Sequence, residues 1–85
     1  MVKVKLFANF REIAGKSEIE LEAETVFNLL VRLTKIYPEL KDLTFENDRP
    51  SEYVNVVVNG RLISDYSMKL NKDDIVAIFP PVSGG

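Results

Sequence analysis

The C-terminus holds the group in this sequence that is best suited to covalent chemistry. The last six residues are Pro80, Pro81, Val82, Ser83, Gly84 and Gly85. The two prolines stiffen the base of this segment in an extended form, and the two glycines leave a tip that fits a channel too narrow for a Cβ atom. A stiff base, a slim tip and the carboxylate of Gly85 suit delivery of a C-terminus into the active site of another protein. A terminus without function is the alternative interpretation.

The side-chain inventory argues against catalysis by this chain itself. The sequence contains no cysteine and no histidine. Disulfides, zinc sites with thiolate or imidazole ligands, and Cys/His or Ser/His/Asp nucleophilic centres are therefore excluded. No remaining side chain has an ordinary pKa near neutrality. We expect a non-enzymatic protein that binds no metal and no cofactor of its own, with the Gly85 carboxylate as its reactive group.

Length and charge narrow the class of protein further. A chain of 85 residues forms one domain at most, and 46% hydrophobic with 28% charged residues is an ordinary globular balance. The net charge of −2 argues against nucleic-acid binding, which needs a basic surface. No apolar run approaches the length of a membrane span, and the alternating first five residues do not form a signal-peptide core. The expected location is the cytoplasm, without nucleic-acid or membrane partners.

Hydrophobic periodicity predicts five strands and one main helix. Alternation or β-branched runs predict strands in segments 2–7, 18–22, 54–58, 61–63 and 75–79. An apolar stripe at helical spacing predicts a helix over 25–37, with Thr25 as N-cap and Pro38 as its stop. The stripe consists of Val26, Leu29, Leu30, Leu33, Ile36 and Tyr37. The resulting fold class is α+β, with the domain in residues 1–79 and an extended tail in residues 80–85.

The segments between these elements are predicted to be mostly irregular. Residues 9–17 form a connection with one helical turn at most, and residues 38–43 form a second short helix. Residues 46–52 are polar, contain Pro50 and read as a surface loop. Asn59-Gly60 is a strong hairpin signal between two strands. Met68 and Leu70, in the connection 64–74, are expected to pack under the core.

The parity of the strands predicts an unusual outer sheet face. The inward positions are Val4, Leu6, Ile19, Leu21, Val54, Val56, Val58, Ile63, Val76 and Ile78. The outward positions then include Phe7, Val57, Leu62, Ile75, Ala77 and Phe79. A sheet face open to water should be polar, so this apolar set indicates a protein interface. A slipped register or a loop covering the face is the alternative.

Several stretches together resemble a known family. They are KLFANFRE at 5–12 with Gly15, VNG at 58–60, Leu70 with DDIVAIF at 73–79, and PPVSGG at 80–85. The whole chain resembles the MoaD/ThiS family of ubiquitin-like sulfur carriers, and within it the small subunit of molybdopterin synthase. The stretch 40–53 is long for a carrier of thiazole synthesis, which favours the molybdopterin branch. The resemblance implies a β-grasp (ubiquitin-like) fold, in which one main helix packs on one face of a five-stranded mixed sheet.

The resemblance also implies a mechanism and partners. An activating enzyme would use ATP to adenylate the Gly85 carboxylate, and sulfur from another protein would then displace AMP and leave a thiocarboxylate. That sulfur would pass to a pterin precursor in the large subunit of molybdopterin synthase. By the same resemblance, Phe7, Leu62 and Phe79 form the hydrophobic docking surface and Arg11 adds a charged contact. The role of Arg11 rests on the resemblance alone, and a solvated surface charge is its alternative.

Three other functions remain open from the sequence. The chain is alternatively a sulfur carrier for thiamine synthesis or tRNA thiolation. It is alternatively a protein modifier, whose activated Gly85 forms an isopeptide bond with a lysine of a target. The third alternative is an interaction domain whose Gly-Gly end has no function. The acyl adenylate is common to carrier and modifier, so the tail does not separate these two.

Overall fold

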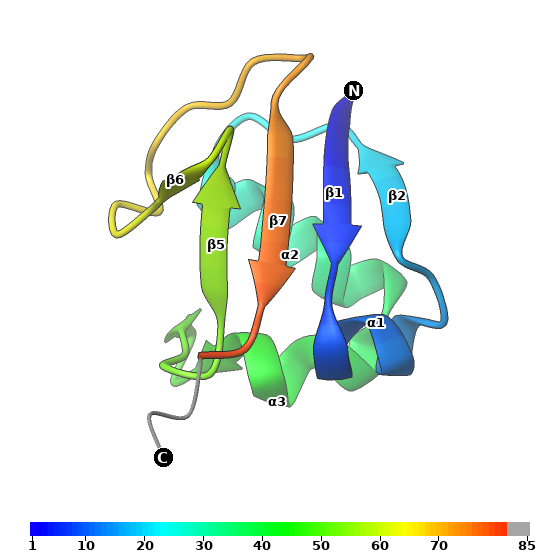
Figure 1. The fold of residues 1–85 in the computed structure, drawn as a ribbon. Coiled ribbons are helices and arrows are strands. Elements are labelled where there is room, and N and C mark those ends of the chain that lie inside the picture. Colours follow the sequence, from blue (N-terminus) through cyan, green and yellow to red (C-terminus); the bar gives the residue numbers. More distant parts are fainter. Residues whose placement is uncertain (82–85) are drawn as a thin grey trace.

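Strand β1 (Val2–Leu6) lies inside a five-stranded sheet in the computed structural model, which describes residues 1–81 (Figure 1). It pairs antiparallel with β2 (Glu18–Leu21) and parallel with β7 (Ile75–Phe79). On its other side β7 pairs antiparallel with β5 (Asn55–Val58), which in turn pairs with β6 (Arg61–Leu62). The strand order is β2-β1-β7-β5-β6, with the parallel pair in the interior of the sheet. This mixed sheet is the one expected for a β-grasp fold.

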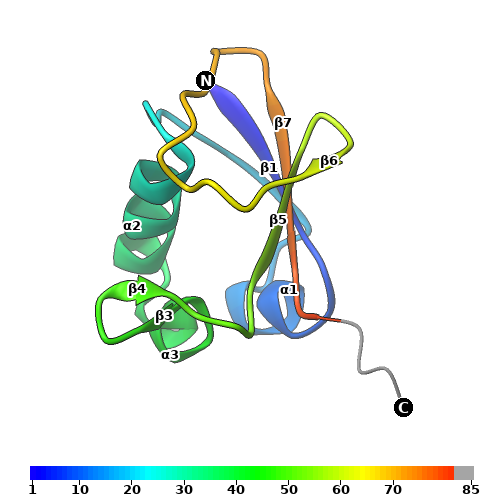
Figure 2. The same ribbon diagram turned by 90° about the vertical axis from the view of Figure 1, so that its left-hand side faces the viewer.

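Helix α2 (Val26–Ile36) covers one face of the sheet (Figure 2). The Thr25 side chain accepts a hydrogen bond from the Asn28 N–H at 3.0 Å, which confirms the predicted N-cap. Leu29, Leu30 and Leu33 are fully buried, so the predicted stripe faces the core over most of its length. Ile36 is the exception. Its side chain is 54% exposed at the last position of the helix, so its assignment to the buried stripe was wrong.

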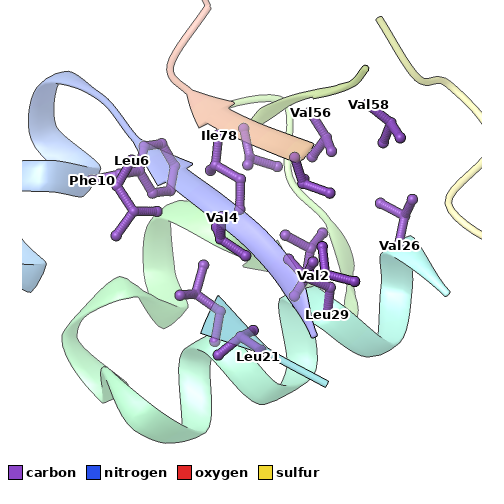
Figure 3. Close-up of a cluster of buried hydrophobic side chains, with 14 of the residues drawn as sticks. Val2, Val4, Leu6, Phe10, Leu21, Val26, Leu29, Val56, Val58 and Ile78 are labelled. Carbon is purple, nitrogen blue, oxygen red and sulfur yellow. The ribbon is translucent and has the colours of Figure 1, made fainter. Parts of the chain in front are cut away.

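The core lies between α2 and the inward positions of the strands (Figure 3). The inward parity is confirmed, with eight of its positions buried and Ile19 and Ile63 partly buried against the core. Met68 and Leu70 pack against this core as expected. Their connection also caps α2, because the Val26 N–H donates to the Met68 carbonyl at 3.0 Å. The sheet and helix are therefore held as one unit, and the opposite sheet face is left uncovered.

A helix stands where the sequence indicated one turn at most. Helix α1 (Ala8–Ala14) follows β1, and Gly15 ends it with a left-handed φ of 74°. Phe10 from this helix is fully buried beside Leu6 (Figure 3), a core residue that the periodicity did not reveal. Phe10, Ile13 and Ala14 stand at helical spacing, but Gly15 ends this pattern after a single repeat. Phe10 and Ala14 both pack into the core, so the contacts of the helix extend beyond its first turn.

The segment expected to be a surface loop contains a small hairpin. The 3-10 helix η1 (Pro38–Leu40) and helix α3 (Lys41–Thr44) come first and agree with the predicted short helix. Strands β3 (Phe45–Glu46) and β4 (Arg49–Pro50) then pair with each other in a separate two-stranded sheet. The two turn residues, Asn47 and Asp48, have φ of 53° and 62°. Asn and Asp tolerate this conformation better than other residues with a side chain, so the turn forms without glycine.

Candidate functional site

The uncovered face of the sheet carries the predicted apolar set. We call this set the outer patch, and it consists of Phe7, Val57, Leu62, Ile75, Ala77 and Phe79. The register places Leu62, Val57 and Ala77 in one row across three strands. Leu62 is 69% exposed, Phe7 and Ile75 are each 42% exposed, and the other three are half-buried. The outward parity is therefore confirmed, and large apolar groups remain in contact with solvent.

Phe7 lies outside β1 but is held at its end by backbone hydrogen bonds. Its N–H donates to the Ile78 carbonyl at 3.1 Å, so it continues the pairing with β7 by one residue. Its carbonyl accepts from the N–H groups of Phe10 and Arg11, at 3.1 and 3.3 Å. The next residue, Ala8, has a φ of 51°, a left-handed conformation that costs an alanine about 1 kcal/mol. This strained corner turns the chain into α1 and fixes Phe7 beside Phe79.

Charged residues occupy the other half of the same face. Lys5 is paired with Ala77 on one side and with Glu18 on the other. The cross-strand row of Leu62, Val57 and Ala77 therefore continues into two charged residues. In residues 1–81 the structure shows one ion pair, between Lys3 Nζ and Glu18 Oε2 at 3.9 Å. Arg11 is exposed on α1, one helical turn beyond Phe7, and has no carboxylate within this distance in the described chain. The side chain is available to a partner that contacts Phe7.

The tail begins at the end of β7. Phe79 is the last residue of the strand, Pro80 is half-buried, and Pro81 is exposed with no secondary structure. Figure 1 shows that β7 ends at the same end of the sheet at which β1 leads into α1. The base of the tail therefore adjoins Phe7 and Phe79 of the outer patch. The candidate residues Val82, Ser83, Gly84 and Gly85 lie outside the described residues.

Side-chain hydrogen bonds anchor the β5–β6 hairpin, which carries Leu62. The Asn59 Nδ2 donates to Asp74 Oδ1 at 2.9 Å, and the Asn59 Oδ1 accepts from the Ile75 N–H at 2.9 Å. The other carboxylate oxygen of Asp74 accepts from the Asn71 N–H at 2.8 Å. Asp74 is 8% exposed, so its two acceptors are satisfied almost entirely within the protein. This network was not predicted, although Asn59-Gly60 correctly indicated the turn.

Reversing donor and acceptor in this network provides a stability test. Asn59→Asp keeps the left-handed φ of 49° accessible but sets two carboxylate oxygens against each other, and we expect it to lower the free energy of unfolding by about 2 kcal/mol. In Asn59→Asp/Asp74→Asn, a new amide donor faces the new carboxylate and all three hydrogen bonds can form again. Denaturant unfolding should therefore show that the double variant is more stable than Asn59→Asp. Additive losses would contradict the network.

Two pKa shifts in the described chain lie away from the outer patch. Hydrogen bonds from the Ser67 hydroxyl and from the Ser67 N–H lower the pKa of Asp65. Burial raises the pKa of Tyr66. Both shifts move the pKa of the group further from neutral pH, whereas a general acid or base works best with a pKa near the working pH. These two groups are therefore poorly suited to proton transfer.

The described part of the chain has neither a metal-binding cluster nor a membrane-spanning helix. Within residues 1–81 no group of three or more carboxylates is placed to hold a metal ion. In the same part of the chain, none of the helices has the length and apolar character needed to cross a bilayer. The predicted site residues within residues 1–81 are members of the outer patch, Arg11 and the start of the tail. Such an arrangement suits binding to another protein.

Comparisons with known proteins point in the same direction. The model of the ThiS family matches residues 4–85. A molybdopterin synthase sulfur carrier subunit from Dictyostelium discoideum is 39% identical, over 98% of this chain and 94% of that protein. Small archaeal modifier protein 3 from Haloferax volcanii is 32% identical, over 99% and 98%. The solution structure of small archaeal modifier protein 1 from Methanosarcina acetivorans superposes with a TM-score of 0.89 at 39% identity, covering 99% of this chain and 95% of that one.

Proposed function

We propose, from the premise that this chain belongs to the ThiS family, that its Gly85 carries sulfur as a thiocarboxylate for molybdopterin synthesis. The observation that supports this most strongly is the position of the outer patch, which adjoins the strand end leading into residues 80–85. A partner docked on the patch would receive the tail at its own active site. The name of the Dictyostelium relative, a sulfur carrier subunit, supports the same assignment and a protein partner.

The proposed chemistry has two steps on the carboxylate. In the first, a carboxylate oxygen of Gly85 attacks the α-phosphorus of ATP in an activating enzyme, and pyrophosphate leaves. In the second, a sulfide equivalent adds to the acyl carbon and AMP leaves, because AMP is a far better leaving group than oxide. In the large subunit of the synthase, the thiocarboxylate sulfur would attack a carbon of a pterin precursor and displace an oxygen substituent. Water would then cleave the bond between this sulfur and the acyl carbon, which returns the Gly85 carboxylate. This chain supplies no catalytic side chain in either step, and ATP is bound by the partner.

Each candidate residue has a distinct role in this proposal. Phe7, Leu62 and Phe79 provide apolar contact with the activating enzyme and with the large subunit, and Arg11 adds a charged contact at the rim. Residues 80–84 form the stem that reaches the partner's active site. We assign the protein to the cytoplasm, because activation consumes ATP.

Protein modification is the second candidate function. The specific observation in its favour is that small archaeal modifier proteins match nearly the full length of this chain. The activated Gly85 would then be attacked by a lysine amine in place of sulfide, and AMP would leave from the same adenylate. Carriers for thiamine synthesis or tRNA thiolation share the sulfide step and differ in the acceptor. The interaction domain without tail chemistry requires neither step.

Intact-mass measurement separates these candidates. The purified protein is incubated with the activating enzyme of its own source, ATP and a sulfide donor, and a reaction without ATP is the control. The starting mass must correspond to a chain that ends at Gly85. Replacement of one oxygen by sulfur supports a carrier, and ATP-dependent attachment to other proteins supports a modifier. An unchanged mass with active enzyme present would contradict both and leave the interaction domain.

The acceptor is tested by a second reaction. The thiocarboxylated protein is mixed with the large subunit of molybdopterin synthase and the pterin precursor. Loss of sulfur from Gly85 together with formation of molybdopterin is expected. Retention of sulfur here, with transfer to a thiazole precursor or to tRNA, would overturn the molybdopterin assignment while keeping the carrier function.

A further inference from the structure

A second surface with aromatic side chains lies on the side of α2 that faces away from the sheet. A groove of about 340 Å³ separates α2 from α3 and the β3–β4 hairpin. We call it the α2 groove, and its main lining residues are Phe27, Val31, Lys35, Lys41, Phe45 and Asp48. Figure 2 shows α2 and the hairpin on one side of the sheet, with the red segment that follows β7 running toward the other. The groove is therefore separate from the outer patch and from the base of the tail.

The floor of the groove is apolar and preformed. The rings of Phe27 and Phe45 meet edge to face with their centroids 5.7 Å apart, and Phe27 remains 39% exposed. Thr34 also lines the groove, and its hydroxyl donates within α2, to the carbonyls of Leu30 and Val31 at 3.1 and 3.0 Å. Phe27 is fixed on α2, where its N–H donates to the Tyr66 carbonyl at 2.7 Å. An apolar ligand would meet aromatic and aliphatic carbon without rearrangement of the backbone.

Hydrogen bonds also fix the β3–β4 hairpin, which forms one wall of the groove. The Ser51 N–H donates to the Thr44 carbonyl at 2.8 Å, and the Thr44 hydroxyl donates to the Leu40 carbonyl at 2.8 Å. Both Thr44 and Ser51 are buried. These bonds join β4 to α3, so Phe45 and Asp48 keep their positions relative to α2. A preformed groove binds a ligand without the entropic cost of ordering its walls.

The rim of the groove is positive, although the whole chain has a net charge of −2. Lys35 and Lys41 are exposed on this rim, and within residues 1–81 neither is within ion-pair distance of a carboxylate. Asp48 is the one acidic residue that lines the groove. The two lysines therefore leave a local excess of positive charge beside apolar carbon. The complementary occupant has carboxylates next to an apolar anchor.

We propose that the α2 groove binds a short acidic segment of another protein, with one apolar side chain seated on Phe27, Val31 and Phe45. The carboxylates of the segment face Lys35 and Lys41. From Phe27 to Lys35 the helix rises by about 12 Å, which matches about four residues of an extended chain. The proposal does not depend on the chemistry of Gly85, and it goes beyond the proposed function.

A second copy of this chain is a poorer match for the groove. The longest acidic stretch of the chain is β2 with the residues that follow it, from Glu18 to Glu24. Its apolar residues face inward, since Leu21 is buried and Ile19 packs against the core. The acidic residues therefore have no exposed apolar anchor among them. Elsewhere an exposed apolar residue has at most one exposed carboxylate beside it in the sequence, as Ile13 has Glu12, which is too few for two lysines. A different protein can present both features together.

Selection from a library of short random peptides tests the proposal. The wild-type protein is the bait, and peptides that also bind Phe27→Ser are removed. We expect the remaining peptides to combine an apolar residue with an excess of Asp and Glu, and to bind more weakly as salt is added. The proposal would be overturned by the absence of enriched peptides, or by enriched peptides without excess acidic residues. It would equally be overturned by a wild-type dimer in solution that Phe27→Ser dissociates.

Two further variants keep the test independent of folding. Lys35→Glu changes an exposed side chain, and we expect it to weaken binding of the selected peptides at least about tenfold with an unchanged thermal midpoint. Ile36→Ser is the matched control, because Ile36 is exposed on the same helix but does not line the groove. Its affinity should equal that of the wild type. Equal binding by Lys35→Glu and wild type, or a loss with Ile36→Ser, would refute the assignment to this groove.

Discussion

Removal of Gly85 is expected to abolish thiocarboxylate formation while the thermal unfolding midpoint stays at the wild-type value. Gly85 would bear the only group that undergoes chemistry, whereas the last strand ends at Phe79 and the last core residue is Ile78. Truncation after Gly84 therefore removes no part of the described core. The measurement is intact mass after incubation with activating enzyme, ATP and a sulfide donor, beside a thermal melt of each protein.

Two variants of the tip keep a C-terminal carboxylate but change the residue beside it or its position. Gly84→Val retains the carboxylate but adds a β-branched side chain where a narrow channel would close around the backbone. One extra residue after Gly85 moves the carboxylate by about 3.3 Å, beyond the tolerance of a positioned reaction. Both variants should fail to accept sulfur and should melt like the wild type. A truncated protein that accepts and donates sulfur at the wild-type rate would end the carrier hypothesis.

Leu62→Asp is expected to weaken binding of the activating enzyme by about thirtyfold or more, because an apolar interface anchor contributes about 2 kcal/mol or more. Leu62 is the most exposed member of the outer patch, so this change should leave the thermal midpoint nearly unaltered. Phe7→Asp should act in the same direction. Titration calorimetry with the purified enzyme gives the affinity, and a thermal melt checks the fold.

Ile36→Asp is the matched control for the charge that Leu62→Asp introduces. It places the same charge at an exposed apolar position of α2, away from the outer patch, and should bind the enzyme normally. Phe79→Asp is less informative, because Phe79 is half-buried and its loss also removes packing at the end of β7. Normal binding by Leu62→Asp and Phe7→Asp would show that the partner docks elsewhere.

Alternation and β-branched runs were sufficient to predict the five strands. Segment 75–79 is apolar on both faces, so the pattern left a slipped register open, and the structure confirmed the predicted faces. The helical stripe was equally informative up to Leu33. It failed at Ile36, the last residue of the helix, whose side chain is exposed. The docking role of Arg11 came from resemblance alone and stays a prediction.

The features that sequence reasoning missed depend on contacts between distant segments. Helix α1 follows the left-handed Ala8, which no local pattern indicates, and the spacing of Phe10, Ile13 and Ala14 is too short to predict a helix with certainty. The hairpin after α3 depends on two non-glycine residues with positive φ. The α2 groove joins Phe27 to Phe45, and no local pattern indicates that these two rings meet.

The parallel pairing of β1 with β7 makes assembly of the sheet depend on the synthesis of β7. The pair joins residues 3–6 to residues 75–78, which are far apart in the sequence. A ribosome makes β1 well before β7, so the interior of the sheet cannot close until β7 has left the ribosome. The row Leu62–Val57–Ala77 also lacks its third member until then. A chain that stops before β7 therefore presents neither the assembled outer patch nor Gly85, and an activating enzyme that needs both would not process it.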